Sequence, residues 1–168
     1  MINVTKLKIH TWPSKILRKK CKLVDKVDKR IKDLFEHLYS LMKAHQGVGI
    51  AANQAGLDLS LIIVEAEDKI FKLANPRILK KEGRIELKEG CLSFPGLVLK
   101  IRRAEKVWVE ALNEDGYPLS IEAKGLLSVI FQHEIDHING IVFVDRLPLW
   151  EKIRVFSQLN KLTKSGLS

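Results

Sequence analysis

The feature that most constrains this chain is a pair of histidines four positions apart, His133 and His137, with Glu134 directly after the first. Positions i and i+4 of a helix share one face, so the two imidazoles can hold one divalent cation. Glu134 lies one position round the helix and can reach a water molecule or a substrate on that cation, which favours hydrolysis. The alternative is that both histidines lie on the surface of a polar helix.

The flanking residues predict that this segment is a buried helix. Apolar residues occur on several faces of the preceding turns, which is typical of a helix inside a domain. They are Leu126, Leu127, Val129, Ile130 and Phe131. Gly125 and Gly140 bracket the segment and are plausible ends for it. A buried helix can carry a metal site from which bulk water is excluded.

A catalytic metal site of this kind needs a third protein ligand and one open position. No histidine or cysteine follows His137, which leaves Asp145 and Glu151 as downstream carboxylates. The upstream candidates are Cys21, Cys91, His10, His37 and His45. Cys91 is the best of them, because it follows a glycine in a turn where the backbone can approach a ligand closely. A lone cysteine is more often a small buried hydrophobe, so Cys91 and Glu151 both stay open at this point.

A glycine-containing run at 47–52 (Gly-Val-Gly-Ile-Ala-Ala) fits a loose dinucleotide-binding fingerprint. That fingerprint must leave a strand and enter a helix, whereas residues 31–42 show helical spacing just before the run. The order is therefore reversed, and we expect the glycines to let backbone pass close to a peptide. Gln54, at the end of the run, would direct its amide at the metal; without the other two motifs, a surface amide would be favoured.

Three segments together resemble the three motifs of peptide deformylases, in that family's order: 47–54, 89–93 and 132–140. The resemblance covers nearly the whole chain. This family removes the formyl group from the N-terminal methionine of new polypeptides, using a metal held by one cysteine and two histidines. The resemblance implies Cys91, His133 and His137 as ligands. It also implies Fe(II) as the physiological ion, with zinc, nickel or cobalt able to occupy the site.

The resemblance and the donor chemistry together predict the catalytic groups. A thiolate and two neutral imidazoles leave a divalent ion with net positive charge, which lowers the pKa of a water on it. Glu134 would accept that proton and return it to the departing amine. The resemblance assigns stabilisation of the oxyanion to the Gln54 side-chain amide and the Leu92 backbone N–H.

A second set of residues is predicted to bind the substrate, N-formyl-methionyl nascent peptides. Gly49 and Gly90 would hold the peptide backbone in an extended pose, as an added strand. Val129 and Ile130 precede the first histidine by four and three positions and face the same side. With Val48, they would line a pocket for the methionine side chain.

The order of periodic segments predicts an α+β fold, with mixed, largely antiparallel sheets packed around a central metal-bearing helix and with N-terminal and C-terminal helices. The expected elements are a helix at 28–44, strands at 59–65, 71–74, 85–88 and 98–101, a hairpin of 107–112 with 119–123, the metal helix and a last helix. In that last helix, apolar residues fall on one face: Leu149, Ile153, Phe156 and Leu159. We expect one catalytic domain spanning 1–168.

Composition limits the cellular location and the binding partners that we expect for this protein. No apolar stretch approaches the roughly 20 residues of a membrane span, and the start lacks the apolar core of a secretory signal, so we expect a cytoplasmic protein. The net charge of +9 invites a nucleic-acid interpretation, and the densest basic cluster lies at Lys15, Arg18, Lys19, Lys20 and Lys22. No RNA-binding signature accompanies this cluster, so a solvated basic face is favoured over sequence-specific nucleic-acid binding. Transient attraction to the ribosome would suit the substrate.

Three hypotheses therefore compete. A peptide deformylase is favoured on the three motifs. A metallo-endopeptidase would use Glu151 as its third ligand in place of Cys91. A basic RNA-associated protein would hold a structural metal, closed by a fourth protein ligand, and would have no use for Glu134.

Overall fold

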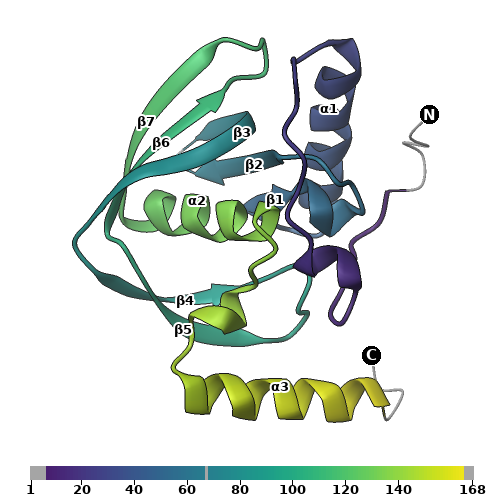
Figure 1. Cartoon of the computed structure of the whole chain (residues 1–168), viewed down its shortest axis with the longest axis vertical. Helices are drawn as coiled ribbons and strands as arrows, with labels where there is room; N and C mark the ends of the chain where they lie inside the picture. Colours follow the sequence, from purple (N-terminus) through teal and green to yellow (C-terminus); the bar gives the residue numbers. More distant parts are fainter. Residues whose placement is uncertain (1–6, 67, 165–168) are drawn as a thin grey trace.

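Two antiparallel sheets and a helix between them form the centre of the molecule (Figure 1). The computed structural model describes residues 7–66 and 68–164, and the side chains only as far as residue 160. A five-stranded sheet has the order β1-β2-β3-β6-β7, with strands Gly49–Ala51, Leu61–Ala66, Lys69–Glu82, Lys106–Leu112 and Pro118–Lys124. A two-stranded sheet pairs β4 (Ile85–Gly90) with β5 (Val98–Arg103). The predicted α+β fold with antiparallel sheets around a central helix is confirmed.

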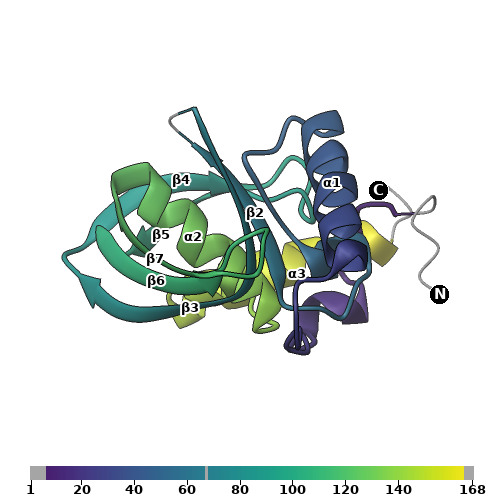
Figure 2. The ribbon, with the colours of Figure 1, turned by 90° about the horizontal axis from the view of Figure 1, so that it is seen from above.

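The central helix, α2 (Gly125–Ile138), is buried over most of its length. All residues from Ser128 to Ile138 are buried, because the large sheet covers one side and the β4–β5 pair lies on another (Figures 1 and 2). Phe131 and Ile135 pack with side chains of β2, β3 and β6 in one apolar cluster. The helix ends at Asn139, and Gly140 follows with a positive φ of 72°. A Cβ on Gly140 would lie 2.6 Å from the Arg18 carbonyl oxygen, so the chain can turn there only with glycine.

Strand β3 is much longer than the predicted 71–74 segment. Its register against β6 shifts between Ala74 and Arg77 and again between Ile78 and Lys80. Asn75 has a positive φ of 54°, and Pro76, which has no N–H to donate, lies in the first irregular stretch. The pairing then resumes as far as Glu82. The Asn-Pro step hid this continuation, because it interrupts the alternating pattern without ending the strand.

The two remaining helices cover the ends of this core. Helix α1 (Lys29–Ala44) matches the predicted 28–44 segment, and its cap is Asp28, whose carboxylate accepts a hydrogen bond from the Ile31 N–H at 3.0 Å. After the 3-10 turn Phe143–Arg146, helix α3 (Leu149–Lys164) lies at the edge of the molecule (Figure 1). No helix in the described ranges is both long and apolar enough to cross a membrane.

The apolar face predicted for α3 is wrong in its first half. Leu149 and Ile153 are 73% and 60% exposed, whereas Phe156 and Leu159 pack in a cluster with Trp12. The Trp12 and Phe156 ring centroids are 5.0 Å apart. Because the cluster that receives α3 lies beside its later turns, the first turn extends past it and stays uncovered.

Candidate metal centre

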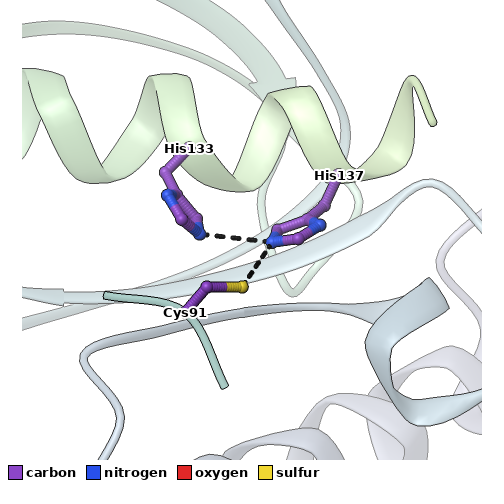
Figure 3. A group of neighbouring side chains, drawn as sticks. All are labelled: Cys91, His133 and His137. Carbon is purple, nitrogen blue, oxygen red and sulfur yellow. Dashed lines mark hydrogen bonds between the residues drawn. The ribbon is translucent and has the colours of Figure 1, made fainter. Parts of the chain in front are cut away.

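Three side chains from two separate elements converge beside α2. Cys91 follows directly after β4, while His133 and His137 project from one face of α2 (Figure 3). The Nε2 atoms of the two imidazoles are 3.2 Å apart, and the Cys91 Sγ lies 3.2 Å from Nε2 of His137. Donors held about 2.0–2.3 Å from a tetrahedral ion are roughly 3.3–3.6 Å from one another, so this group fits one metal ion with little adjustment. In the described part of the chain, these three residues form the one such group of potential ligands.

The histidines differ in their protonation. Burial lowers the pKa of His137 well below its ordinary value, and the charges of His133 and Arg103 lower it further, so this imidazole is in the neutral form that binds metals. Burial also disfavours a charged His133, but hydrogen bonds with Cys91 and Glu89 outweigh it and raise its pKa well above the ordinary value. Without an ion, the His133 imidazole therefore tends to hold a proton, and metal binding would release it.

A buried ionic network holds the His133 ring. Its Nδ1 lies 2.8 Å from Oε2 of Glu89, which leaves Nε2 free for the ion. Arg103, 5% exposed, donates from Nε and Nη2 to the two Glu89 oxygens at 2.8 and 2.9 Å. Its Nη1 donates to Asp136, which also accepts hydrogen bonds from Arg146. Burial raises the pKa of Glu89, but the hydrogen bonds from Arg103 and His133 outweigh burial and lower this pKa to about 2.

Sequence reasoning missed this network. Glu89 lies within a recognised motif, and its position two residues before Cys91 on a strand would have indicated an inward-facing side chain. Arg103 carried no signal, because its partners come from β4 and α2 and depend on how the two sheets enclose the helix.

Glu134 and Gln54 flank the metal group. Burial raises the pKa of Glu134 to about 7, and its Oε2 atom has no hydrogen-bond partner among the described residues. The Gln54 amide is oriented at both ends. Its Oε1 accepts from the Ala51 N–H at 2.9 Å, while its Nε2 lies 3.1 Å from the Ser93 hydroxyl and 3.4 Å from the Cys91 sulfur.

A pocket of about 360 Å³ opens onto this group. Its lining includes all of the residues predicted to contact substrate: Val48, Gly49, Gly90, Val129 and Ile130. It also includes Gln54, Leu92, Glu134 and Gly47 of the glycine run, together with Gln46, Lys88 and Leu126, which were not predicted. Val129 and Ile130 are buried, whereas Val48 and Leu126 are exposed. The pocket therefore lies between the ends of β1 and β4 and presents apolar side chains beside the metal group.

The competing ligands lie elsewhere. Glu151 is in the first turn of α3 and is not part of the ligand group. Asp145 is paired with Arg18 and Lys152. Cys21 packs in the apolar cluster between α2 and the large sheet, where burial raises the pKa of its thiol to about 11. With three ligands and no fourth among the described residues, the group has the composition of a catalytic site and differs from a closed structural one.

The chain is similar to known proteins over most of its length. The family model described as polypeptide deformylase matches residues 6–152. The chain belongs to the peptide deformylase family. A peptide deformylase of Aquifex aeolicus is 42% identical in an alignment 160 positions long, which covers 92% of this chain and 95% of that protein. The enzyme accordingly removes the formyl group from the N-terminal formylmethionine of nascent peptides.

Solved structures of the family agree with the fold. The crystal structure of a peptide deformylase from Legionella pneumophila has a TM-score of 0.85 and 37% identity, and the match covers 95% of this chain and 96% of that one. A peptide deformylase from Synechococcus elongatus, crystallised in complex with actinonin, has a TM-score of 0.85 and 33% identity, with coverage of 97% and 87%.

Proposed function

We propose that this deformylase holds one divalent ion on Cys91, His133 and His137. The convergence of one sulfur and two Nε2 atoms carries this assignment, with the Glu89 contact that turns His133 toward the others. When bound, the ion supplies a Lewis acid that polarises a carbonyl group and lowers the pKa of water. Fe(II) is the ion that the family resemblance favours, and thiolate and imidazole donors also suit zinc, nickel and cobalt.

Glu134 serves as general base and then as general acid. Its carboxylate accepts a proton from the attacking water and returns it to the amine that leaves as the formyl group departs. Two features support this role: Glu134 lines the pocket beside the ligand group, and its pKa of about 7 matches a group that exchanges protons near neutral pH. Its Oε2, which lacks a partner among the described residues, is available to the water.

Gln54 and Leu92 stabilise the oxyanion that develops on the formyl oxygen. The Gln54 amide group is held with Nε2 beside the Cys91 sulfur, so it donates without reorganisation. The Leu92 N–H lies one residue after the cysteine ligand, and no acceptor for it occurs within the described ranges. Two donors fixed before the reaction are what an oxyanion site requires.

The peptide binds as an extended strand between β1 and β4. Gly49 and Gly90 lie on these strands. β1 is at one end of the large sheet, and β4 pairs with β5 alone among the described strands. An added strand therefore finds backbone groups on both sides. Val129 and Ile130, with Val48 and Leu126, form an apolar pocket for the methionine side chain. The actinonin complex of the Synechococcus relative supports binding of a ligand to this fold.

We further propose that the chain acts as a single catalytic domain in the cytoplasm, where nascent polypeptides are made. The net charge of +9 favours transient contact with the ribosome through electrostatic attraction. Sequence-specific recognition of nucleic acid forms no part of this function.

The test is an assay of anaerobically prepared enzyme on matched formyl-Met, acetyl-Met and internally cleavable peptides. We expect formyl-Met peptides to be preferred over acetyl-Met by at least about 10²-fold in kcat/KM, because an acetyl methyl group would displace the carbonyl by about 1 Å in the crowded site. Cleavage of an internal bond, or equal rates on formyl and acetyl substrates, would contradict the proposal.

A further inference from the structure

Two adjoining pockets lie apart from the deformylase pocket and share no lining residue with it. The smaller, of about 290 Å³, is lined in part by the turn from β3 to β4. That turn is at the left of Figure 1. The larger, of about 610 Å³, lies between the N-terminal segment, β3 and the end of α2. Arg103 lines the smaller pocket but is paired with Glu89 and Asp136. The other cationic side chains of the two, here called the basic groove, are Lys20, Arg77, Lys81, Arg84, Arg102 and Arg146. Lys81 and Arg146 line both pockets, so the two adjoin.

The charge of the basic groove is only partly neutralised. The acidic residue that lines it is Asp136, whose oxygens are already bound by Arg103 and Arg146. Arg77 pairs with Glu110 at 2.8 Å. Within the described ranges, Lys81 and Arg84 have no carboxylate at ion-pair distance.

Two other acids lie near the groove, and one of them forms a loose ion pair with a groove arginine. Glu86 approaches Arg102 only to 3.9 Å, and Glu105 lies against Gly83 at the edge of the smaller pocket. The basic cluster expected from the sequence contributes Lys20 to the groove, but three of its other members are paired with carboxylates. Its Arg18 is paired with Asp145, and its Lys19 and Lys22 with Asp58.

The surroundings of Lys81 destabilise the charged form of its side chain. Burial lowers the pKa of its ammonium group, and the charge of Arg146 lowers it further against the opposing effect of Asp136. The fold thus gathers cations at a cost in electrostatic energy that a bound anion would relieve.

We propose that the basic groove binds the phosphodiester backbone of double-helical RNA. Arginine side chains bind phosphate oxygens through paired N–H groups, and two adjoining pockets can receive more than one phosphate. No residue lining either pocket is aromatic, so unpaired bases would find no stacking surface. Contact is therefore with the backbone and independent of base sequence. An enzyme whose substrates are polypeptides in synthesis works among structured RNA, which favours this polyanion.

The experiment uses the full-length, metal-loaded enzyme and a fluorescently labelled RNA hairpin, with anisotropy measured over a series of salt concentrations. The variant Lys81→Gln/Arg84→Gln removes two charges from the groove. Its control, Lys26→Gln/Lys29→Gln, removes two charges from exposed lysines elsewhere. We expect the groove variant to bind at least about tenfold more weakly and to lower the slope of log K against log salt by about two. The control should change affinity by less than about threefold.

Three results would overturn the proposal. Equal weakening in the two variants would mean that net charge alone attracts RNA. Tighter binding of single-stranded RNA of equal length would mean that bases are contacted. Equal affinity for poly-glutamate of matched charge would mean that the groove receives acidic protein. Deformylation is the internal check, since both variants should keep wild-type kcat/KM, and Lys81→Arg/Arg84→Lys should keep RNA binding.

Discussion

Replacing Gly49 with alanine should disable this enzyme through the position of Glu134. A Cβ on Gly49 would lie 2.3 Å from Oε1 of Glu134, 2.8 Å from its Cδ and 3.0 Å from its Cγ. Ordinary van der Waals contact begins near 3.4 Å, so the carboxylate would have to retreat by about 1 Å. The backbone of Gly49 lies outside the left-handed region, so alanine itself is tolerated there.

The expected magnitude follows from this displacement. Misplacing a catalytic group by about 1 Å costs on the order of 10²-fold in rate. We therefore expect Gly49→Ala to lower kcat by roughly 10²-fold while the metal content stays at one ion per chain. Thermal stability should change little, because the clash is with the far end of a flexible side chain.

The control is a double-mutant cycle with Glu134→Ala, measured as kcat/KM on a formyl-Met peptide. If alanine at 49 acts through Glu134, the double variant should be no slower than Glu134→Ala alone. Additive losses would show that the methyl group obstructs the peptide, and a Gly49→Ala enzyme with near wild-type kcat would refute the reasoning.

Four further predictions concern the metal and its surroundings. Cys91→Ala should lose tight metal binding while Cys21→Ala retains it, as read by metal analysis of the purified proteins. Glu134→Gln should keep its metal yet lose about 10²- to 10⁴-fold in kcat, because one group serves both proton transfers; a metal-loaded variant with normal turnover would exclude that role. The iron form should lose activity in air faster than the nickel form, and equal half-lives would count against oxidation at iron or Cys91. Finally, the pKa of Glu89 falls from 4.5 to about 2 on folding, so its carboxylate stabilises the fold fully above pH 4.5. This contribution of about 3 kcal/mol is lost as the pH drops toward 2. The free energy of unfolding of the metal-free protein, measured with urea, should therefore fall less over that pH range in Glu89→Gln than in wild type.

The sequence alone predicts much of the local structure. The i, i+4 spacing of His133 and His137 places both on one helical face whatever surrounds them. Asp28 begins α1 because its side chain caps a free N–H, and alternating apolar residues specify β6 and β7. These features depend on residues within a few positions of one another, where the periodicity of helix or strand dictates the geometry.

Other features arise only when distant segments pack together. The sequence could not by itself distinguish Cys91 from Glu151 as third ligand, and the family resemblance was needed for that choice; in the fold, β4 brings the Cys91 sulfur to 3.2 Å from His137, 46 positions away in the chain. Arg103 owes its partners to the enclosure of α2 by both sheets. The basic groove likewise joins cations from five segments, while the contiguous cluster near Lys19 is largely paired. Periodicity describes which way a side chain points from its own element, whereas its neighbours depend on strand register and packing between elements, which no local pattern encodes.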